Sequence, residues 1–208
     1  MVRRVWHRQA LWGAVTAMAL VSARPAPGDV PQGPARAQGD VSPLPVLGRA
    51  PEFRLHSLEG PRVGLQDLRG KVVLLALMCA ICSDEPAEVV AGFARLQIEL
   101  KGRGLFGRRV VLVFIARHPE WDLRAALRAF AGRLGADPFG WVILTGSPAA
   151  TARLRVAFAG LAAHPGGSPG GDVKGQVFLV DYAGRVRRVY HAPAFDPDAV
   201  LKEIQLLL

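Results

Sequence analysis

The chain has 208 residues, half of them apolar, and a mean hydropathy of +0.23. That length suits one domain with a tail, and the apolar content excludes a wholly disordered chain. Lys and Arg (26) outnumber Asp and Glu (17), but no basic patch interleaved with aromatic residues accompanies the formal charge of +9. We therefore expect no nucleic-acid partner. A positive charge of this size instead fits an anionic membrane surface or an acidic partner.

The amino terminus has the layout of a secretory signal. Arg3, Arg4 and Arg8 precede a short apolar run over residues 10–21, and small residues follow up to Ala23. The run is shorter than the ~20 apolar residues that a membrane-spanning helix needs. We interpret residues 1–23 as a secretory signal peptide and expect an extracytoplasmic location, in the periplasm or cell envelope. An uncleaved amino-terminal anchor is the alternative, and it would keep the domain near a membrane.

The next segment is rich in Pro, Gly and Ala and shows no periodicity. It covers residues 24–47, and its composition predicts a disordered linker. One folded domain is then expected over residues 48–208.

Within that domain, strand and helix patterns alternate. Short strands over residues 53–55 and 62–64 flank a Glu-Gly-Pro turn and predict a hairpin. Continuous apolar runs at 72–78 and 110–115 are typical of strands buried on both faces. Further strands are expected over 141–144, 177–180 and 186–190, and helices over 83–100, 123–134, from 148 and from 197. The order predicts an α/β domain whose central mixed β-sheet carries helices on both faces and follows an amino-terminal hairpin.

The two cysteines of the chain, Cys79 and Cys82, form a C-x-x-C directly after the strand at 72–78. The carboxyl end of a central strand is where such sheets present their chemistry. The pattern predicts Cys79 in an exposed turn and Cys82 at a helix amino terminus, which favours a thiolate. In an exported chain, a reversible bond between these two thiols is the natural expectation. Inert core cysteines are the alternative, while a structural zinc site lacks a second ligand pair.

Two carboxylates follow the cysteines. Asp84 and Glu85 disfavour a nearby thiolate and so oppose the helix dipole. Their expected role is to stabilise the amino terminus of the helix that begins at Ser83.

Several segments together resemble one known family. The resemblance depends on eight single residues near the start of the domain and on four later segments. The single residues are Pro51, Phe53, Leu55, Gly60, Leu65, Leu68, Gly70 and Lys71. The segments are FIARHPEWD (114–122), RLGADP (133–138), WVILTG (141–146) and VFLVDYAGR (177–185). Over residues 48–208 the chain is similar to the thioredoxin superfamily, and within it to the Sco/SenC family of cytochrome oxidase assembly proteins. The resemblance implies a thioredoxin-like fold and a cytochrome oxidase subunit as a partner.

Sco/SenC proteins bind copper through two cysteines spaced C-x-x-x-C and a distant histidine, and they deliver it to cytochrome oxidase or reduce its thiols. This sequence departs from that pattern. Met78 takes the first cysteine position, Val173 the histidine position, and His118 stands where the family has Asp. Gly175 occupies the place of the proline that related reductases carry before a late strand, and the prolines at 165 and 169 lie too far upstream.

The resemblance and the motif together give three hypotheses. The first is an extracytoplasmic Sco-like thiol–disulfide oxidoreductase, without a required cofactor, in which Cys79 attacks a partner disulfide and Cys82 resolves the mixed disulfide. The second is a non-enzymatic carrier that holds Cu(I) through Cys79 and Cys82, with Met78, His118 or His164 as further candidate ligands. The third is a binding domain that keeps the fold and a disulfide of no consequence.

Overall fold

The computed structural model describes residues 43–162 and 173–208. The predicted signal peptide (1–23), the first part of the predicted linker, His164 and the prolines at 165 and 169 lie outside the described residues. The elements, in chain order, are β1 (Gly48–Arg49), β2 (Arg54–Ser57), β3 (Arg62–Gly64), the 3-10 helix η1 (Leu65–Leu68), β4 (Val72–Met78), α1 (Ala87–Gly102), β5 (Val110–Ala116), α2 (Arg124–Leu134), β6 (Trp141–Thr145), α3 (Pro148–Ala162), β7 (Gln176–Val180), β8 (Arg185–His191) and α4 (Pro197–Gln205).

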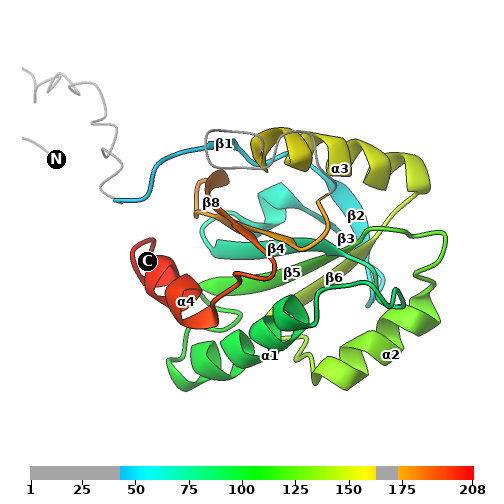
Figure 1. Cartoon of the computed structure of the whole chain (residues 1–208), viewed down its shortest axis with the longest axis horizontal. Helices are drawn as coiled ribbons and strands as arrows, with labels where there is room; N and C mark the ends of the chain where they lie inside the picture. The colour runs from blue at the N-terminus through cyan, green and yellow to red at the C-terminus, as the bar shows by residue number, and fades with distance from the viewer. Residues whose placement is uncertain (1–42, 163–172) are drawn as a thin grey trace, which may run out of the picture. The chain divides into compact units, whose positions relative to one another are not determined.

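The strands of the described residues form one sheet in the order β1-β8-β7-β4-β5-β6-β2-β3 (Figure 1). Parallel pairing joins β4 to β5 and β5 to β6, whereas β4–β7 and β7–β8 are antiparallel. The predicted mixed sheet with an antiparallel late pair is therefore confirmed. β2 and β3 pair antiparallel, with Leu55 opposite Val63, and β2 also joins the sheet through β6.

The central strands β4 and β5 are buried along their whole length, as their continuous apolar runs predict. Because successive side chains of a strand point to opposite faces, alternate residues enter two separate cores. Leu74 and Phe114 pack with the apolar faces of α1, α2 and α4, whereas Leu75 and Val113 pack with α3. Figure 1 shows α3 on one side of the sheet and α1 on the other, so the prediction of helices on both faces is confirmed.

The first long helix starts later than the sequence pattern predicts. α1 begins at Ala87, with Pro86 as its amino-terminal cap residue, and not at Ser83. Proline disfavours the helical conformation in the residue before it, so the helix cannot extend back through Glu85 without strain. The loop after Cys79 is longer than expected as a result.

Residues just before position 48, in the predicted linker, contact β8. The backbone N–H of Leu47 donates to the Val186 carbonyl at 2.8 Å, and Arg187 donates to the Leu44 carbonyl. Arg187 is itself buried and pairs with buried Asp181 at 3.0 Å. The last residues of the predicted linker are thereby attached to β8.

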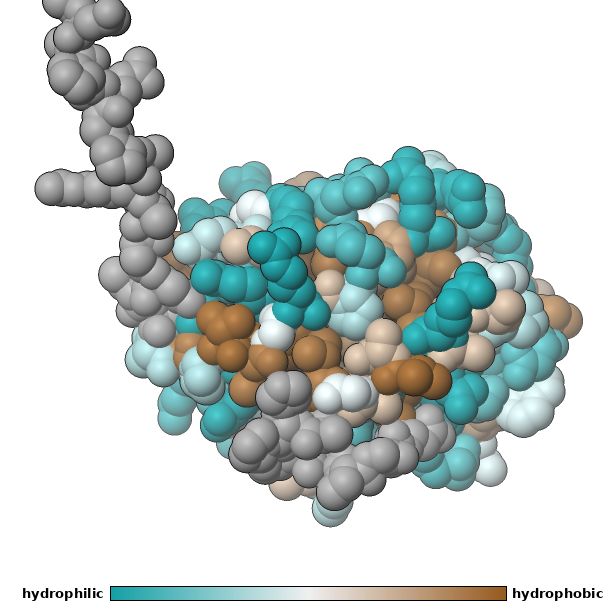
Figure 2. All heavy atoms as spheres, turned by 90° about the horizontal axis from the view of Figure 1, so that it is seen from above, coloured by the Kyte–Doolittle hydropathy of each residue, from teal (hydrophilic) through white to brown (hydrophobic). Residues whose placement is uncertain are grey.

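Apolar side chains gather in the middle of the face shown in Figure 2, between polar ones. More than half of the accessible surface of an ordinary folded protein is apolar, so this patch alone identifies no partner. No helix in residues 43–162 or 173–208 combines the length and the apolar character needed to cross a membrane.

Candidate functional site

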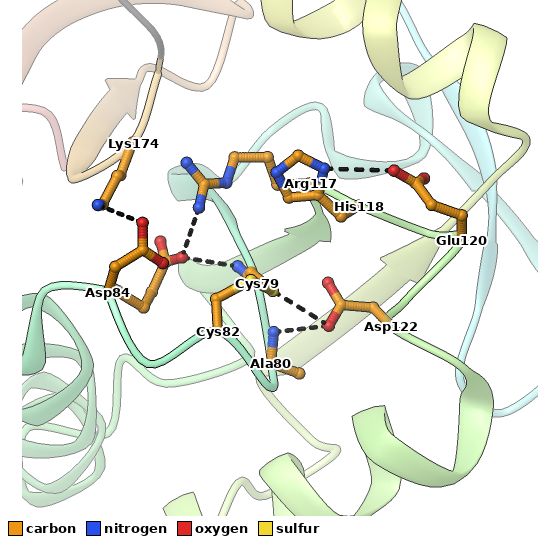
Figure 3. A network of polar contacts seen from close by, with 10 residues as sticks. Cys79, Ala80, Cys82, Asp84, Arg117, His118, Glu120, Asp122 and Lys174 are labelled. Carbon is orange, nitrogen blue, oxygen red and sulfur yellow. Dashed lines mark hydrogen bonds and ion pairs between the residues drawn. A yellow bond between two sulfur atoms is a disulfide. The ribbon is translucent and has the colours of Figure 1, made fainter.

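Cys79 and Cys82 lie directly after β4 and form a disulfide, with their Cα atoms 5.4 Å apart (Figure 3). The two cysteines differ in exposure: Cys79 is 2% exposed, whereas Cys82 is partly exposed. The prediction of an exposed turn at Cys79 is therefore wrong. Cys79 directly follows the last residue of β4. The backbone after β5 is still hydrogen-bonded to the end of β4, because Arg117 donates its N–H to the Met78 carbonyl at 2.7 Å.

Cys82 does not lie at a helix amino terminus. A loop that includes Pro86 separates Cys82 from Ala87, the first residue of α1. The effect of a helix dipole falls off beyond the first turn, so the predicted stabilisation of a Cys82 thiolate by α1 is also wrong.

Glu85 folds back onto the disulfide loop. Its Oε2 accepts the Cys79 N–H at 3.0 Å and pairs with the Arg117 guanidinium at 3.0 Å. The side chains of Glu85 and Arg117 are 6% and 3% exposed, so this is a buried ion pair. Burial raises the pKa of Glu85, against the opposite effect of the Arg117 charge. The predicted role of Glu85 in stabilising the helix terminus is replaced by a role inside the loop.

Asp122, from the loop between β5 and α2, approaches the disulfide from the other side. Its Oδ1 accepts the Ala80 N–H at 2.8 Å and lies 3.7 Å from the Cys79 sulfur (Figure 3). Asp122 is 1% exposed, and burial raises the pKa of its carboxyl. Glu85 and Asp122 thus hold consecutive backbone N–H groups at the first cysteine.

Asp84 is exposed and pairs with Lys174 at 2.5 Å. The hydrogen bond from Lys174 is the main cause that lowers the pKa of Asp84. Lys174 belongs to the segment before β7, so the pair connects that segment with the loop before α1. Asp84 therefore serves a connection between loops, and not the helix terminus for which it was predicted.

The segment before β7 packs closely against the same loop. Gly175 has φ +68°, and a Cβ atom there would lie 3.0 Å from Pro86 Cγ and 3.1 Å from Ala192 Cβ. The neighbouring Val173 is 1% exposed and belongs to the core on the α3 side of the sheet. At the position where the family resemblance places a copper-binding histidine, this chain therefore has a core side chain.

The two other candidate ligands in the part of the chain that the structure describes, His118 and Met78, are held by other contacts. The Nδ1 of His118 lies 3.3 Å from Glu120 Oε1, and its ring stacks on Trp121, so the imidazole is directed toward Glu120 (Figure 3). Met78 is buried in the core on the side of α1. Within the described part of the chain, no three His, Cys, Asp or Glu side chains are grouped as a metal site requires.

Sequence reasoning missed the functional neighbourhood of Arg117 and Asp122. Both follow β5, which is parallel to β4 and adjacent to it. Residues after the carboxyl ends of adjacent parallel strands meet at one edge of the sheet. That rule, applied to the two buried runs, would have placed Arg117 and Asp122 beside the cysteines.

A model of the SCO1/SenC family matches residues 47–208. The chain belongs to the SCO1/SenC family. A search of the curated proteins found no match for this chain.

Solved structures show the same fold. A SCO1/SenC family lipoprotein from Bacillus anthracis is 22% identical, with a TM-score of 0.61, and the match covers 78% of this chain and 96% of that one. BsSco, in a structure described as revealing a disulfide switch, is 20% identical with a TM-score of 0.62 and coverages of 78% and 95%. Yeast Sco1 with copper bound is 17% identical with a TM-score of 0.59 and coverages of 77% and 94%.

The substitution Asp122→Asn tests the buried carboxylate, because it keeps an oxygen that can accept the Ala80 N–H. Burial raises the pKa of Asp122 above its unfolded value of about 3.9. Its contribution to stability is therefore complete below that value and is lost as the pH rises through the folded-state pKa. We measure the free energy of unfolding in urea from about pH 3 to about pH 8. The unmutated protein should lose the Asp122 contribution as the pH rises, whereas the Asp122→Asn variant should not show that decrease. Identical pH dependence in both proteins would show that Asp122 does not titrate as described.

Proposed function

We propose that this SCO1/SenC protein is an exported thiol–disulfide oxidoreductase that acts through Cys79 and Cys82. The observation that carries the proposal is the disulfide itself, which lies at the carboxyl end of β4 with Cys82 partly exposed. The buried Val173 at the family's histidine position favours electron exchange over metal capture, because it removes an expected ligand. The reaction requires no cofactor.

The unequal burial of the cysteines assigns their roles. A partner sulfur must reach the sulfur that it bonds, and Cys82 is the more accessible of the two. We therefore assign the mixed disulfide to Cys82 and the resolving step to Cys79, which reverses the order expected from the sequence. The assignment holds in both directions of electron flow, because both directions pass through the same mixed disulfide.

In the reducing direction, the Cys82 thiolate attacks a disulfide sulfur of the partner and displaces one partner thiolate. Cys79 then gives up its proton, which passes through solvent to the partner thiolate displaced in the first step, and attacks the Cys82 sulfur, which releases the second partner thiolate. Two electrons pass to the partner, and the Cys79–Cys82 disulfide forms. A dithiol reductant in the same compartment must restore the thiols before the next turnover.

The proposed location and partner follow from the same site. Cytosolic thiols are kept reduced, whereas disulfides persist in exported proteins, and residues 1–23 have the layout of an export signal. We place the domain in the periplasm or cell envelope, close to the membrane if the amino-terminal segment is retained. BsSco is described as belonging to a family of cytochrome c oxidase assembly proteins, so we propose a thiol or disulfide of a cytochrome oxidase subunit as the partner.

Trapping of the mixed disulfide tests the proposal. The reduced Cys79→Ser variant retains the attacking Cys82 but cannot resolve, so we expect it to accumulate a covalent adduct with a disulfide-containing peptide, visible by mass spectrometry. The matched Cys82→Ser variant should form at least about tenfold less adduct in the same time, because Cys79 is buried. Equal adduct in both variants would contradict the assigned order, and no adduct in either would contradict the proposed activity.

A Cu(I) carrier is the second candidate function. Thiolates suit Cu(I), and yeast Sco1, which shares the fold, has been solved with copper bound. In this chain Cys79 and Cys82, once reduced, would hold the ion, and no described His, Asp or Glu is grouped with them as a third ligand. The two sulfurs fit such a cargo as a two-ligand site.

Competition for Cu(I) separates the two functions. For an oxidoreductase with a two-sulfur site, we expect the reduced chain to leave Cu(I) with a chelator of moderate affinity, while both thiols remain free and reactive. Capture of one Cu(I) per chain, lost in both Cys79→Ser and Cys82→Ser, would favour the carrier. The third hypothesis, a binding domain without thiol chemistry, predicts a disulfide that resists reduction. It also predicts that neither cysteine substitution changes partner binding.

A further inference from the structure

A groove of about 460 Å³ opens beside the disulfide, between the first half of α1 and the second half of α2. Both cysteines contribute to its lining. A volume of this size is within the range of about 300–1,000 Å³ found for ligand-binding pockets. Any molecule whose sulfur bonds to Cys82 therefore has this groove next to its own reactive sulfur.

The walls of the groove are mostly apolar. Val90, Ala91 and Ala94 line it from α1, and Phe130 and Leu134 line it from α2. The side chains of α1 project little into the groove, because two of these three are methyl groups. Ile81, between the two cysteines in the sequence, is 57% exposed.

The charge available at the groove is positive. Arg133 lines it, donates to the Ala80 carbonyl at 3.2 Å, and lies over the Phe130 ring with 5.9 Å to the centroid. Of the lining residues that α2 contributes, Arg133 is the charged one. The acidic side chain in the lining, Glu85, is buried and paired with Arg117. An occupant with a negative charge near the α2 wall is thus complementary.

We propose that the groove binds a segment of the substrate polypeptide in which an apolar residue and an acidic residue stand next to the cysteine that bonds to Cys82. This proposal rests on the proposed oxidoreductase function and specifies its substrate class. The occupant is a polypeptide, because it must place a sulfur on Cys82 and an apolar side chain between α1 and α2 at once.

Single-turnover oxidation of the reduced chain by cyclic disulfide peptides tests this specificity without a recycling reductant. Each turnover converts one peptide disulfide to two thiols and leaves the Cys79–Cys82 disulfide. The peptides carry Leu-Glu, Ser-Glu or Leu-Lys beside one cysteine, and hydroxyethyl disulfide serves as a substrate too small to fill the groove. We expect the Leu-Glu peptide to react at least about tenfold faster than the Ser-Glu peptide, since one apolar contact in a pocket contributes roughly 10–200-fold.

Groove variants locate the effect. Ala91→Leu fills the α1 wall, and we expect it to lower the ratio of the Leu-Glu rate to the hydroxyethyl disulfide rate by about tenfold. Ala129→Leu is the matched control, an exposed alanine of α2 outside the lining, and should leave that ratio unchanged. Arg133→Glu should reverse the preference for Leu-Glu over Leu-Lys, whereas Arg128→Glu, also outside the lining, should not.

The outcomes separate the groove from the reaction. If Ser-Glu reacts as fast as Leu-Glu, or if Ala91→Leu and Ala129→Leu behave alike while exchange proceeds, the groove proposal fails and the oxidoreductase stands. If glutathione disulfide reacts faster than every peptide and Ala91→Leu removes that advantage, the occupant is a small thiol and the proposal also fails. If neither the peptides nor hydroxyethyl disulfide oxidise the chain, the proposed function fails, and the groove proposal fails with it.

Discussion

Two buried carboxylates hold the backbone of the disulfide loop. Glu85 accepts the N–H of Cys79, and Asp122 accepts the N–H of Ala80. Cys79 and Ala80 are buried directly after β4, where an unsatisfied backbone N–H costs roughly 1–3 kcal/mol. The buried Arg117 balances the charge of Glu85. The path of the chain through the first cysteine is therefore fixed, and the chemistry of the site follows from that path.

The fixed path makes the two sulfurs unequal. Cys79 is covered by the structure that holds it, while Cys82 lies further along the loop, where solvent reaches it. Such asymmetry suits a dithiol that bonds to a partner through one sulfur and resolves through the other. It serves metal capture less well, because the position of the family's histidine lies in the core as Val173 and the adjacent Lys174 is paired with Asp84.

The sequence predicted the fold better than the site. The runs 72–78 and 110–115 become β4 and β5, because continuous apolar patterns suit strands buried on both faces. The start of α1 was misplaced because the apolar periodicity begins at Val89 and does not define the first turn, and Pro86 prevents the helix from including Glu85. The burial of Cys79 and the hydrogen bond from its N–H to Glu85 could not be predicted, since both depend on how the loop between β4 and α1 folds back in space.

The most direct measurement is the order in which the reduced chain is alkylated. Limiting iodoacetamide, followed by peptide mapping, identifies the thiol that reacts first under native conditions. Our account predicts that the label enters at Cys82, and that Cys79 is labelled at a comparable rate only after denaturation. Preferential labelling of Cys79 in the folded chain, or no labelling of either thiol, would contradict it.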